Sequence, residues 1–299
     1  MEQINYFISG ASGFIGGQLC DFLKEQGHHC LKVSRKVIEQ QDSRSLHSPS
    51  SKGKKVFIHL AARVHNTKCH DDQLYYRDNV VLSKKAIELA KNLGCSQFIF
   101  MSTIKVFGEV QTEPYTEATT PLPKTAYGRS KLTAEQELIS LNQSLKMRLD
   151  MVRIPLVIDM NAKGNIETLV KVVKKGVPLP FGLLTAPRAF VFRGELIQKL
   201  YDVSLMESQH ASENLHLVCQ QEGMSTSSLL RWIGQNLGKQ VRLVPVPLSM
   251  LKFFALIGDL GGYLLNKKLP FNSDVFEKIA LPMEMVPKST QLVSIKKES

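Results

Sequence analysis

Short apolar runs alternate with amphipathic stretches along the first half of the chain. The apolar runs predict buried strands at residues 4–8, 29–33, 56–62, 97–101 and 149–157. Between them, apolar residues at helical spacing predict helices at 14–23, at about 73–92 and from 127 onward. Strands that alternate with helices in this way form parallel sheets covered on both faces. The pattern therefore predicts an α/β fold with a Rossmann-type doubly wound parallel sheet.

The second half follows a less regular pattern. It predicts a helix over 169–175, strands at 215–218 and 241–247, and a helix that begins at the serine-rich residues 225–228. We expect residues 1–157 to form a dinucleotide-binding domain. Residues 158–299 should form mainly a smaller C-terminal substrate lobe, with some strands returning to the sheet. Residues 37–55 are polar, lack periodicity and predict a long exposed loop.

Residues 248–265 are the most apolar stretch of this second half. Lys252 and Asp259 interrupt the stretch and three glycines break it, so a transmembrane span is not expected. The favoured interpretation is a buried helix of the substrate lobe. The alternative is peripheral contact with a membrane surface, through the apolar face and the pair Lys267-Lys268.

A glycine-rich turn lies between the first predicted strand and the first predicted helix. Gly10, Gly13 and Gly16 follow a three-residue spacing. Glycine adopts positive φ, and its missing side chain lets backbone N–H groups approach a pyrophosphate at the positive end of the helix. A purely structural turn is the alternative, but the place between strand and helix favours a dinucleotide site. The expected cofactor contacts in this turn are Gly10, Ser12, Gly13, Phe14, Ile15 and Gly16.

Two further strand ends bear on the cofactor. Residues 29–33 are followed by Ser34-Arg35-Lys36, where NAD-binding proteins usually carry a carboxylate for the ribose hydroxyls. A guanidinium at Arg35 suits the 2′-phosphate of NADP, so we expect NADP, with NAD as the alternative. The third predicted strand ends in Ala61-Ala62, small residues that let a cofactor lie close to the backbone.

Candidate catalytic groups follow the fourth predicted strand. Tyr127 and Lys131 are four residues apart, so a helix places them on one face. A lysine cation beside a phenol is expected to lower the phenol pKa from about 10 and make it usable for proton transfer. A hydroxyl from Thr103 or Ser102 could hydrogen-bond the same reacting oxygen.

The composition does not contradict the prediction of a dinucleotide-binding protein. The chain has a formal net charge of +11, and its basic residues are scattered, without an aromatic platform or recognition helix for nucleic acid. We therefore expect a solvated basic surface or attraction of anionic nucleotides. The five cysteines show no C-x-x-C spacing, and no metal site is expected. Reduced thiols and the absence of a visible signal peptide predict a cytoplasmic protein.

Together these pieces resemble the extended short-chain dehydrogenases/reductases, the NAD-dependent epimerase/dehydratase family. The matching motifs are Gly10-x-x-Gly13-x-x-Gly16, His59-Leu60-Ala61-Ala62, Asn79, Phe100-Met101-Ser102-Thr103 and Tyr127-x-x-x-Lys131. The resemblance implies that Thr103 is the catalytic hydroxyl, that Tyr127 is the acid/base, and that Lys131 holds the nicotinamide ribose. It also implies cofactor contacts at Leu60, Ala61, Ala62 and Asn79, and a homodimer.

The resemblance narrows the chemistry. Sugar 4,6-dehydratases of the family carry Asp-Glu after the catalytic threonine, whereas Ile104-Lys105 follow Thr103 here and cannot supply those carboxylates. The second half resembles bacterial surface-polysaccharide UDP-sugar 4-ketoreductases and 4-epimerases. That resemblance implies contacts from Asn165 and Arg188 to the UDP moiety, and a guanidinium suits a diphosphate. A surface arginine after a proline turn is the alternative at position 188.

Three functions remain open. The leading expectation is NADP-preferring reduction of the C4 ketone of a UDP-4-keto-6-deoxy-N-acetylhexosamine, for O-antigen or capsule synthesis. The alternative is a UDP-hexose or UDP-N-acetylhexosamine 4-epimerase with tightly bound NAD. A non-catalytic nucleotide sensor is the third, disfavoured because Thr103, Tyr127 and Lys131 are all present.

Overall fold

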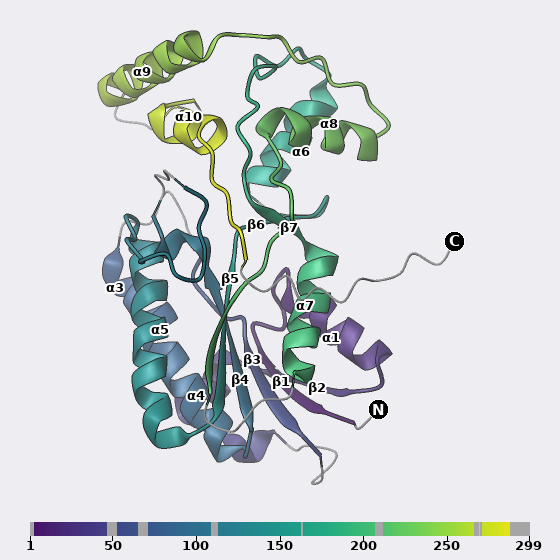
Figure 1. The fold of residues 1–299 in the computed structure, drawn as a ribbon, viewed down its shortest axis with the longest axis vertical. Helices are drawn as coiled ribbons and strands as arrows, with labels where there is room; N and C mark the ends of the chain where they lie inside the picture. The colour runs from purple at the N-terminus through teal and green to yellow at the C-terminus, as the bar shows by residue number, and fades with distance from the viewer. Residues whose placement is uncertain are drawn as a thin grey trace.

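The computed structural model describes residues 3–46, 53–64, 71–108, 113–162, 164–206, 212–265, 269 and 271–287. A sheet with flanking helices forms the larger part of the molecule, and a smaller lobe lies beyond one end of the strands (Figure 1).

The larger part is built on one six-stranded parallel sheet. Its strands are β1 (Asn5–Ser9), β2 (His29–Val33), β3 (Lys55–His59), β4 (Gln97–Thr103), β5 (Arg148–Ile154) and β8 (Glu213–Leu217). They run in the order β2-β1-β3-β4-β5-β8, and every neighbouring pair is parallel. The order reverses between β1 and β3, and ligands bind at such a switch point, outside the carboxyl ends of the strands. The predicted doubly wound fold is confirmed.

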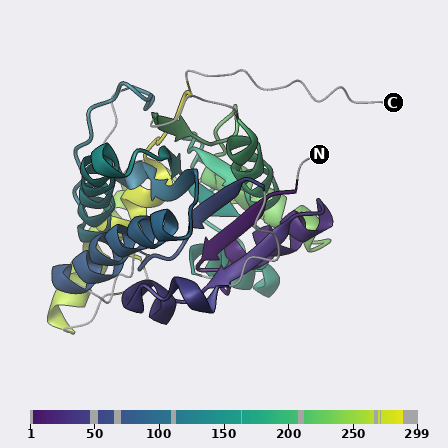
Figure 2. The same cartoon turned by 90° about the horizontal axis from the view of Figure 1, so that it is seen from below.

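Helices cover both faces of this sheet (Figure 2). On one face lie α1 (Gly16–Glu25) and α7 (Arg193–Leu205), which bury Leu19 and Leu200 in one apolar cluster. On the other lie α2 (Arg35–Gln40), α4 (Leu82–Asn92) and α5 (Ala126–Leu145), whose cluster includes Ala86 and Leu138. Because both faces are covered, the central strands are continuous apolar runs rather than alternating ones.

The helices on this second face depart from the prediction at two places. Residues 37–55 are not all loop, because Ser34 Oγ accepts a hydrogen bond from Val37 N at 3.3 Å and starts α2, which buries Ile38. Residues 47–52 lie outside the described part. The helix expected at about 73–92 is interrupted: α3 (Asp72–Tyr75) runs into a widened π-turn at Tyr76–Val81 before α4.

The strand expected at 149–157 is two strands. Pro155 has no N–H for a sheet ladder, and β5 ends before it. The chain then enters β6 (Leu156–Ile158), which pairs in parallel with β7 (Phe190–Phe192) outside the main sheet. From β7 the chain returns through α7 and β8 to the sheet.

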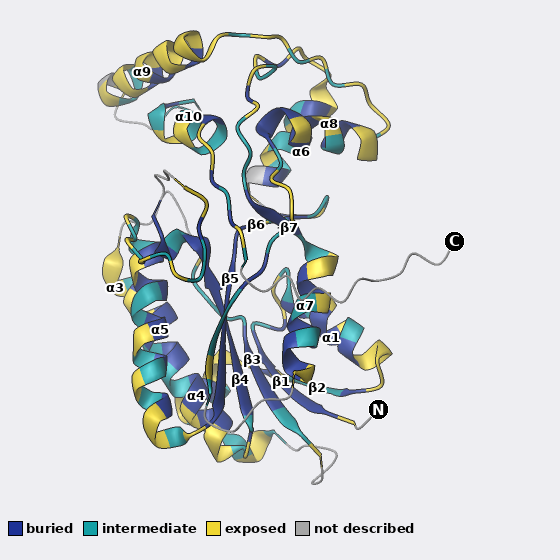
Figure 3. Ribbon diagram, viewed as in Figure 1, coloured by how far each residue is buried: buried dark blue, intermediate teal, exposed yellow. Residues whose placement is uncertain are grey.

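The smaller lobe contains α6 (Asn165–Lys175), α8 (Thr226–Asn236), α9 (Leu248–Leu264) and α10 (Ser273–Ala280). The strand expected at 241–247 is wrong, since only one isolated bridge joins Leu243 to Leu179 and prolines at 245 and 247 withhold ladder donors. The expectation that the apolar stretch 248–265 is buried is also wrong. It does form a helix, but most of that helix is exposed (Figure 3).

Candidate active site

The glycine turn packs tightly between the ends of β1 and β3. Gly10 has φ of +72°, and a Cβ added there would lie 2.8 Å from Ala61 N. A Cβ at Gly16 would lie 2.3 Å from Gly10 O, which already accepts a hydrogen bond from Gly13 N at 2.9 Å. Side chains at these positions would force the turn apart. The strand end at 60–62 and the glycine turn therefore form one continuous backbone surface.

That surface continues into the N-terminus of α1. Within the described residues 3–46, no side chain caps this end and no acidic residue occupies its first turn. By contrast, Ser34, Thr125 and Ser225 cap α2, α5 and α8. The exposed residues Ser12 and Gly13 lead into the N-terminus of α1. The first-turn N–H groups and the helix dipole suit an anion, so this chain's residues fit the pyrophosphate of a dinucleotide.

Phe14 ties the glycine turn to the lobe. The guanidinium of Arg193 lies 4.5 Å from the centroid of the Phe14 ring, and Arg193 also donates to Phe14 O at 3.2 Å. Arg193 pairs with Asp159 just after β6, at 2.9 Å. Ile15 packs into the cluster under α1 and α7. The expected cofactor contacts of Phe14 and Ile15 stay predictions, but both residues anchor the glycine turn.

A cluster of guanidinium groups surrounds Asp78 near the end of β2. Asp78 accepts from Arg35 at 2.8 Å, Arg77 at 2.9 Å and Arg63 at 2.7 Å. Burial raises the pKa of Asp78, but these hydrogen bonds outweigh it and hold the pKa well below its usual range. Arg35 is half-exposed and also pairs with Glu39 at 2.7 Å. A cationic group therefore stands where a 2′-phosphate is expected, although Arg35 already shares its charge with two carboxylates.

Asn79, in the π-turn, joins the end of β3 to α5. Its Oδ1 accepts from Arg63 N at 2.7 Å, and its Nδ2 donates to Arg63 O at 3.1 Å and to Ser130 Oγ at 2.9 Å. Asn79 is completely buried, whereas Leu60, Ala61 and Ala62 are partly exposed. These bonds orient the strand end beside the glycine turn, so the expected cofactor residues gather at one edge of the sheet.

Thr103 and Tyr127 meet at the same edge. Thr103 is the last residue of β4, and Tyr127 lies in the first turn of α5, which Thr125 caps by accepting from Gly128 N at 3.0 Å. The Thr103 and Tyr127 side chains are hydrogen-bonded to each other. Tyr75 of α3 lies beside Tyr127, with 6.4 Å between the two ring centroids. The structure thus brings together the predicted hydroxyl and the predicted acid/base.

The expected effect of Lys131 on Tyr127 is wrong in this structure. Burial raises the pKa of Tyr127 to about 12, although the hydrogen bond with Thr103 opposes the shift. Lys131 is itself almost completely buried, and burial lowers its pKa to about 7. Its Nζ lies 3.9 Å from the centroid of the Phe100 ring. A desolvated lysine over an aromatic ring supplies less charge to its neighbour than the helical spacing alone indicates.

Ser102 has a different partner from Thr103. The two residues alternate along β4, and Ser102 Oγ donates to Glu135 Oε1 at 2.5 Å. Glu135 also forms a buried two-point ion pair with Arg153, at 3.0 and 2.6 Å. The structure therefore places Ser102 in a buried network and does not bring it to the hydroxyl pair.

The two predicted UDP contacts lie in the lobe. Asn165 is the first residue of α6, and its side chain is outside what the structure describes. Arg188 is partly exposed, and its guanidinium donates to Leu281 O at 2.5 Å and approaches Met283 Sδ at 3.7 Å. It holds the segment after α10 against the chain before β7.

Sequence reasoning missed the buried polar groups that support the site. His59, the last residue of β3, lies between Ser9 Oγ at 2.7 Å and Ser83 Oγ at 3.1 Å. Burial lowers the pKa of His59 to about 3, so the ring is neutral and bridges β1 to α4. The sequence signals were a histidine in an otherwise apolar strand and its place in the motif His59-Leu60-Ala61-Ala62, neither of which indicates its serine partners. Glu135 was likewise visible only by its spacing, one helical turn after Lys131.

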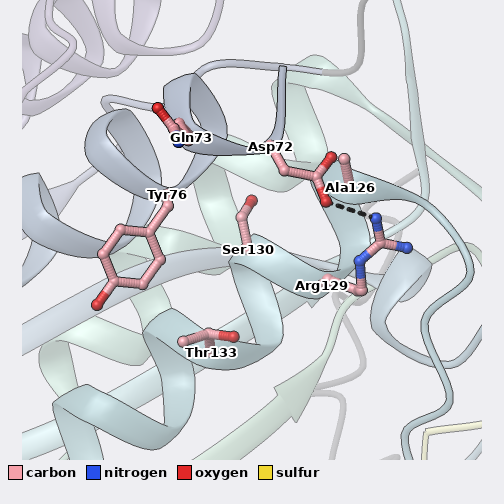
Figure 4. A pocket seen from close by; sticks show the side chains of 7 residues that line it. All are labelled: Asp72, Gln73, Tyr76, Ala126, Arg129, Ser130 and Thr133. Atoms are coloured by element: carbon pink, nitrogen blue, oxygen red, sulfur yellow. Dashed lines mark hydrogen bonds and ion pairs between the residues drawn. The ribbon is translucent and has the colours of Figure 1, made fainter. Parts of the chain in front are cut away.

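The described surface also contains a shallow cavity of about 510 Å³ beside the site, between α3 and α5. Figure 4 shows Asp72 paired with Arg129 across one side, at 2.8 Å, with Tyr76 opposite. Its α5 residues are Ala126, Arg129, Ser130 and Thr133, which lie on the helix face next to that of Tyr127 and Lys131. It is therefore a neighbouring feature and not the reaction site.

No helix of the described part is long and apolar enough to cross a membrane. Among the described residues, no three His, Cys, Asp or Glu side chains are grouped so that they could hold a metal ion.

The fold and this edge define a Rossmann-type protein whose glycine turn fits a dinucleotide and whose sheet edge also carries Thr103, Tyr127 and Lys131. The model of the NAD dependent epimerase/dehydratase family matches residues 6–206, and the chain belongs to that family. Membership of a family of enzymes removes the support for a non-catalytic sensor.

Individual relatives and solved structures are similar to the chain over most of its length. The chain is 28% identical to a UDP-glucose 4-epimerase of Vibrio cholerae over 268 residues, which cover 83% of this chain and 80% of that protein. The structure of a Thermotoga maritima UDP-glucose 4-epimerase with UDP-glucose is similar, with a TM-score of 0.65 and 21% identity over 81% of this chain and 86% of that one. A Bacillus anthracis dTDP-4-dehydrorhamnose reductase with NADP has a TM-score of 0.66 and 18% identity over 93% and 98% of the two chains. At these identities the structures establish the fold.

Proposed function

We propose that this protein is a UDP-hexose or UDP-N-acetylhexosamine 4-epimerase that uses NAD. The observation that carries the proposal is the match to a UDP-glucose 4-epimerase over 83% of the chain. The contact between Thr103 and Tyr127 supports it. This is the function that the sequence alone ranked second. Cytoplasmic location, a homodimer and a role in surface polysaccharides remain predictions.

The glycine turn, the α1 N-terminus and the strand end at 60–62 would hold the dinucleotide. When bound, the oxidised nicotinamide would supply a hydride acceptor at carbon C4 of its own ring, and its positive charge would favour the phenolate of Tyr127. Thr103 orients the oxygen on C4 of the sugar, and Tyr127 removes the proton from that oxygen and later returns it. Lys131, with its pKa near 7, adds positive charge on the same helix face when protonated.

The raised pKa of Tyr127 sets its protonation state before cofactor and substrate bind. With a pKa of about 12, the group is a neutral phenol at pH 7. It is thus ready to donate a proton to a ketone oxygen, whereas oxidation of an alcohol first requires removal of the phenol proton. An epimerase needs both directions, so its rate of alcohol oxidation should increase with pH.

Arg35 supports a second candidate, net reduction of a UDP-4-keto sugar by NADPH. The strand end lacks a carboxylate, and three guanidinium groups gather around Asp78. An arginine fork suits a 2′-phosphate. Against this, Asp78 and Glu39 already pair with Arg35 and reduce the charge that it offers.

One experiment separates the two candidates. The purified protein is denatured, and the released nucleotide is identified by chromatography. In parallel, the native protein is incubated with UDP-glucose or UDP-N-acetylglucosamine without added cofactor, and the C4 epimers are measured by NMR. A reductase assay with NADPH and UDP-4-keto-6-deoxy-N-acetylglucosamine follows the absorbance of the reduced nicotinamide.

An epimerase should release NAD and equilibrate at least one UDP-sugar with its C4 epimer, with no net consumption of NADPH. Stoichiometric NADPH oxidation by the keto sugar without epimerisation would replace the proposal by the second candidate. Absence of both reactions across the UDP-sugars would overturn the UDP-sugar proposal. The matched control is Tyr127→Phe, which keeps the ring and removes the phenol.

A further inference from the structure

Helix α9 contacts the rest of the protein through one narrow side. Its buried positions are Leu251, Ala255 and Gly258, which repeat at three- and four-residue spacing. Gly258 lets α9 approach the chain before α10 so closely that an added Cβ would lie 1.9 Å from Phe271 O. This side accounts for the attachment of the helix and uses none of its large aromatic residues.

The opposite side of α9 is apolar and faces solvent. Phe253 is 60% exposed and Tyr263 is 84% exposed. The exposed large apolar residues of α9 are Leu248, Met250, Phe253, Phe254, Leu256, Ile257, Leu260 and Tyr263. A surface helix normally turns charged residues outward, as α6 does with its lysines, and a contiguous apolar face marks an interaction surface.

The position of α9 leaves this side accessible. In Figure 1 the helix lies at the end of the long axis farthest from the sheet, and its own axis runs across the long axis. Figure 3 shows it as mainly exposed, with α10 beneath it. A flat surface that approaches this end of the molecule would therefore meet the length of α9.

The length and charge of this region indicate which surface fits. Seventeen residues extend about 25 Å as a helix, too short to span a bilayer, and a helix of this kind lies in the plane of the interface. Residues 223–272 contain one acidic residue, Asp259, and six basic ones: Arg231, Lys239, Arg242, Lys252, Lys267 and Lys268. The first four basic residues are exposed, and the last two lie outside the described part.

We propose that α9 binds the protein peripherally to an anionic lipid bilayer, with its aromatic and aliphatic side chains among the headgroups and acyl-chain ends. Phe, Leu and Ile enter the apolar boundary, Tyr263 suits the headgroup level, and the exposed Lys252 of α9 itself pairs with a lipid phosphate. A symmetric contact between two copies through α9 would instead bring the basic surroundings of both copies together.

The test measures binding of the full-length protein to sedimented vesicles. One set contains phosphatidylcholine with phosphatidylglycerol, and the other contains phosphatidylcholine alone. The α9 variant is Phe253→Ser/Ile257→Ser/Leu260→Ser. The matched control, Leu205→Ser/Met206→Ser, replaces exposed apolar residues at the C-terminal end of α7, at the amino-end edge of the sheet. Thermal unfolding checks that each variant is folded, and light scattering gives its mass.

The wild type and the control should bind anionic vesicles, and the α9 variant should bind about tenfold less or weaker still. Lys252→Gln should weaken binding to the anionic vesicles but not to the neutral ones. A higher salt concentration should likewise weaken binding to the anionic vesicles. Equal binding by wild type and α9 variant would overturn the proposal, as would failure of the wild type to bind. A folded α9 variant whose mass halves while vesicle binding is absent would assign the surface to a contact between copies.

Discussion

The sheet and helix α9 use apolar residues in opposite ways. In the sheet, Phe57, Phe98 and Phe100 are completely buried between two layers of helices. In α9, an equally apolar sequence is covered on one side alone, and Phe253 and Phe254 face solvent. An apolar run predicts burial only where elements exist to cover both of its sides. The remaining apolar surface of α9 is therefore available for another function.

The polar residues differ between the two parts as well. At the carboxyl edge of the sheet, buried polar groups are paired in networks: His59 with two serines, Asn79 with Arg63 and Ser130. Such networks hold a site in one geometry. In the lobe, the predicted substrate residue Arg188 instead binds a backbone carbonyl near α10. On the proposed function, the comparison predicts that the chemistry takes place at the sheet edge and that the lobe contributes substrate contacts.

Removal of the Tyr127 phenol is the strongest test of that division. Tyr127→Phe should lower kcat about 10²–10⁴-fold, because the variant loses the acid/base but keeps its packing. The melting temperature should change by only a few degrees. The control in the lobe, Arg188→Gln, should raise KM for the nucleotide sugar and change kcat much less. A comparable loss of kcat in Arg188→Gln would move part of the chemistry into the lobe.

Two phenylalanine substitutions compare the burial directly. Phe98→Ala opens a space beside Phe57, whose ring centroid is 5.4 Å away, and should lower the free energy of unfolding by about 3–5 kcal/mol. Phe253→Ala should change the same quantity by at most about 0.5 kcal/mol. Urea denaturation measures both. If Phe253→Ala costs as much as Phe98→Ala, the solvent-facing position of α9 is incorrect.

A pH series sharpens the account of the buried site. The Lys131 pKa of about 7 lies below the 10.5 of an exposed lysine, so between these values the unfolded chain holds one proton more than the folded chain. The free energy of unfolding should therefore rise with pH across that window, by up to about 1.4 kcal/mol per pH unit, and this contribution should be lost as the pH falls toward 7.

Lys131→Met removes this group, so its stability relative to wild type should fall between pH 7 and pH 9. Denaturation at several pH values measures the difference, with the exposed Lys124→Met as the control. Parallel pH curves for wild type and Lys131→Met would contradict the lowered pKa.

The strands of the sheet and the glycine turn could be predicted because each of them is determined by residues adjacent in the sequence. The strands at 4–8 and 29–33 and the glycine turn at 10–16 are each defined by a few adjacent residues, and all lie where the pattern places them. The interruption in helix 73–92 was not predictable, because it depends on Asp78 and Asn79 meeting partners far along the chain, Arg35 and Ser130.

The site shows the same limit. Helical spacing placed Tyr127 and Lys131 on one face, but spacing cannot report desolvation, which raises one pKa and lowers the other. Ser102 and Thr103 point to opposite sides of β4, but the sequence does not show which of them lies toward Tyr127. That choice depends on Glu135 and Arg153, which bind on the Ser102 side and are distant in the sequence. In the lobe, residues 241–247 have the composition of a strand, but only Leu243 finds a bridge partner.

The smallest expected effect concerns the cofactor end of the site. Arg35→Ala leaves Asp78 with Arg63 and Arg77, so the π-turn should stay intact and the fold should lose little stability. If the protein holds NAD, its affinity for NAD should change by less than about threefold, since no 2′-phosphate meets the arginine. If it uses NADPH, KM for NADPH should rise about tenfold while KM for NADH stays constant, the loss of one charge-assisted phosphate contact. Nucleotide titration of wild type, Arg35→Ala and Lys36→Ala separates these results, because Lys36 carries the same charge one residue further on. A selective loss of NADPH in Arg35→Ala would show that Asp78 holds the guanidinium in place for the phosphate rather than neutralising it.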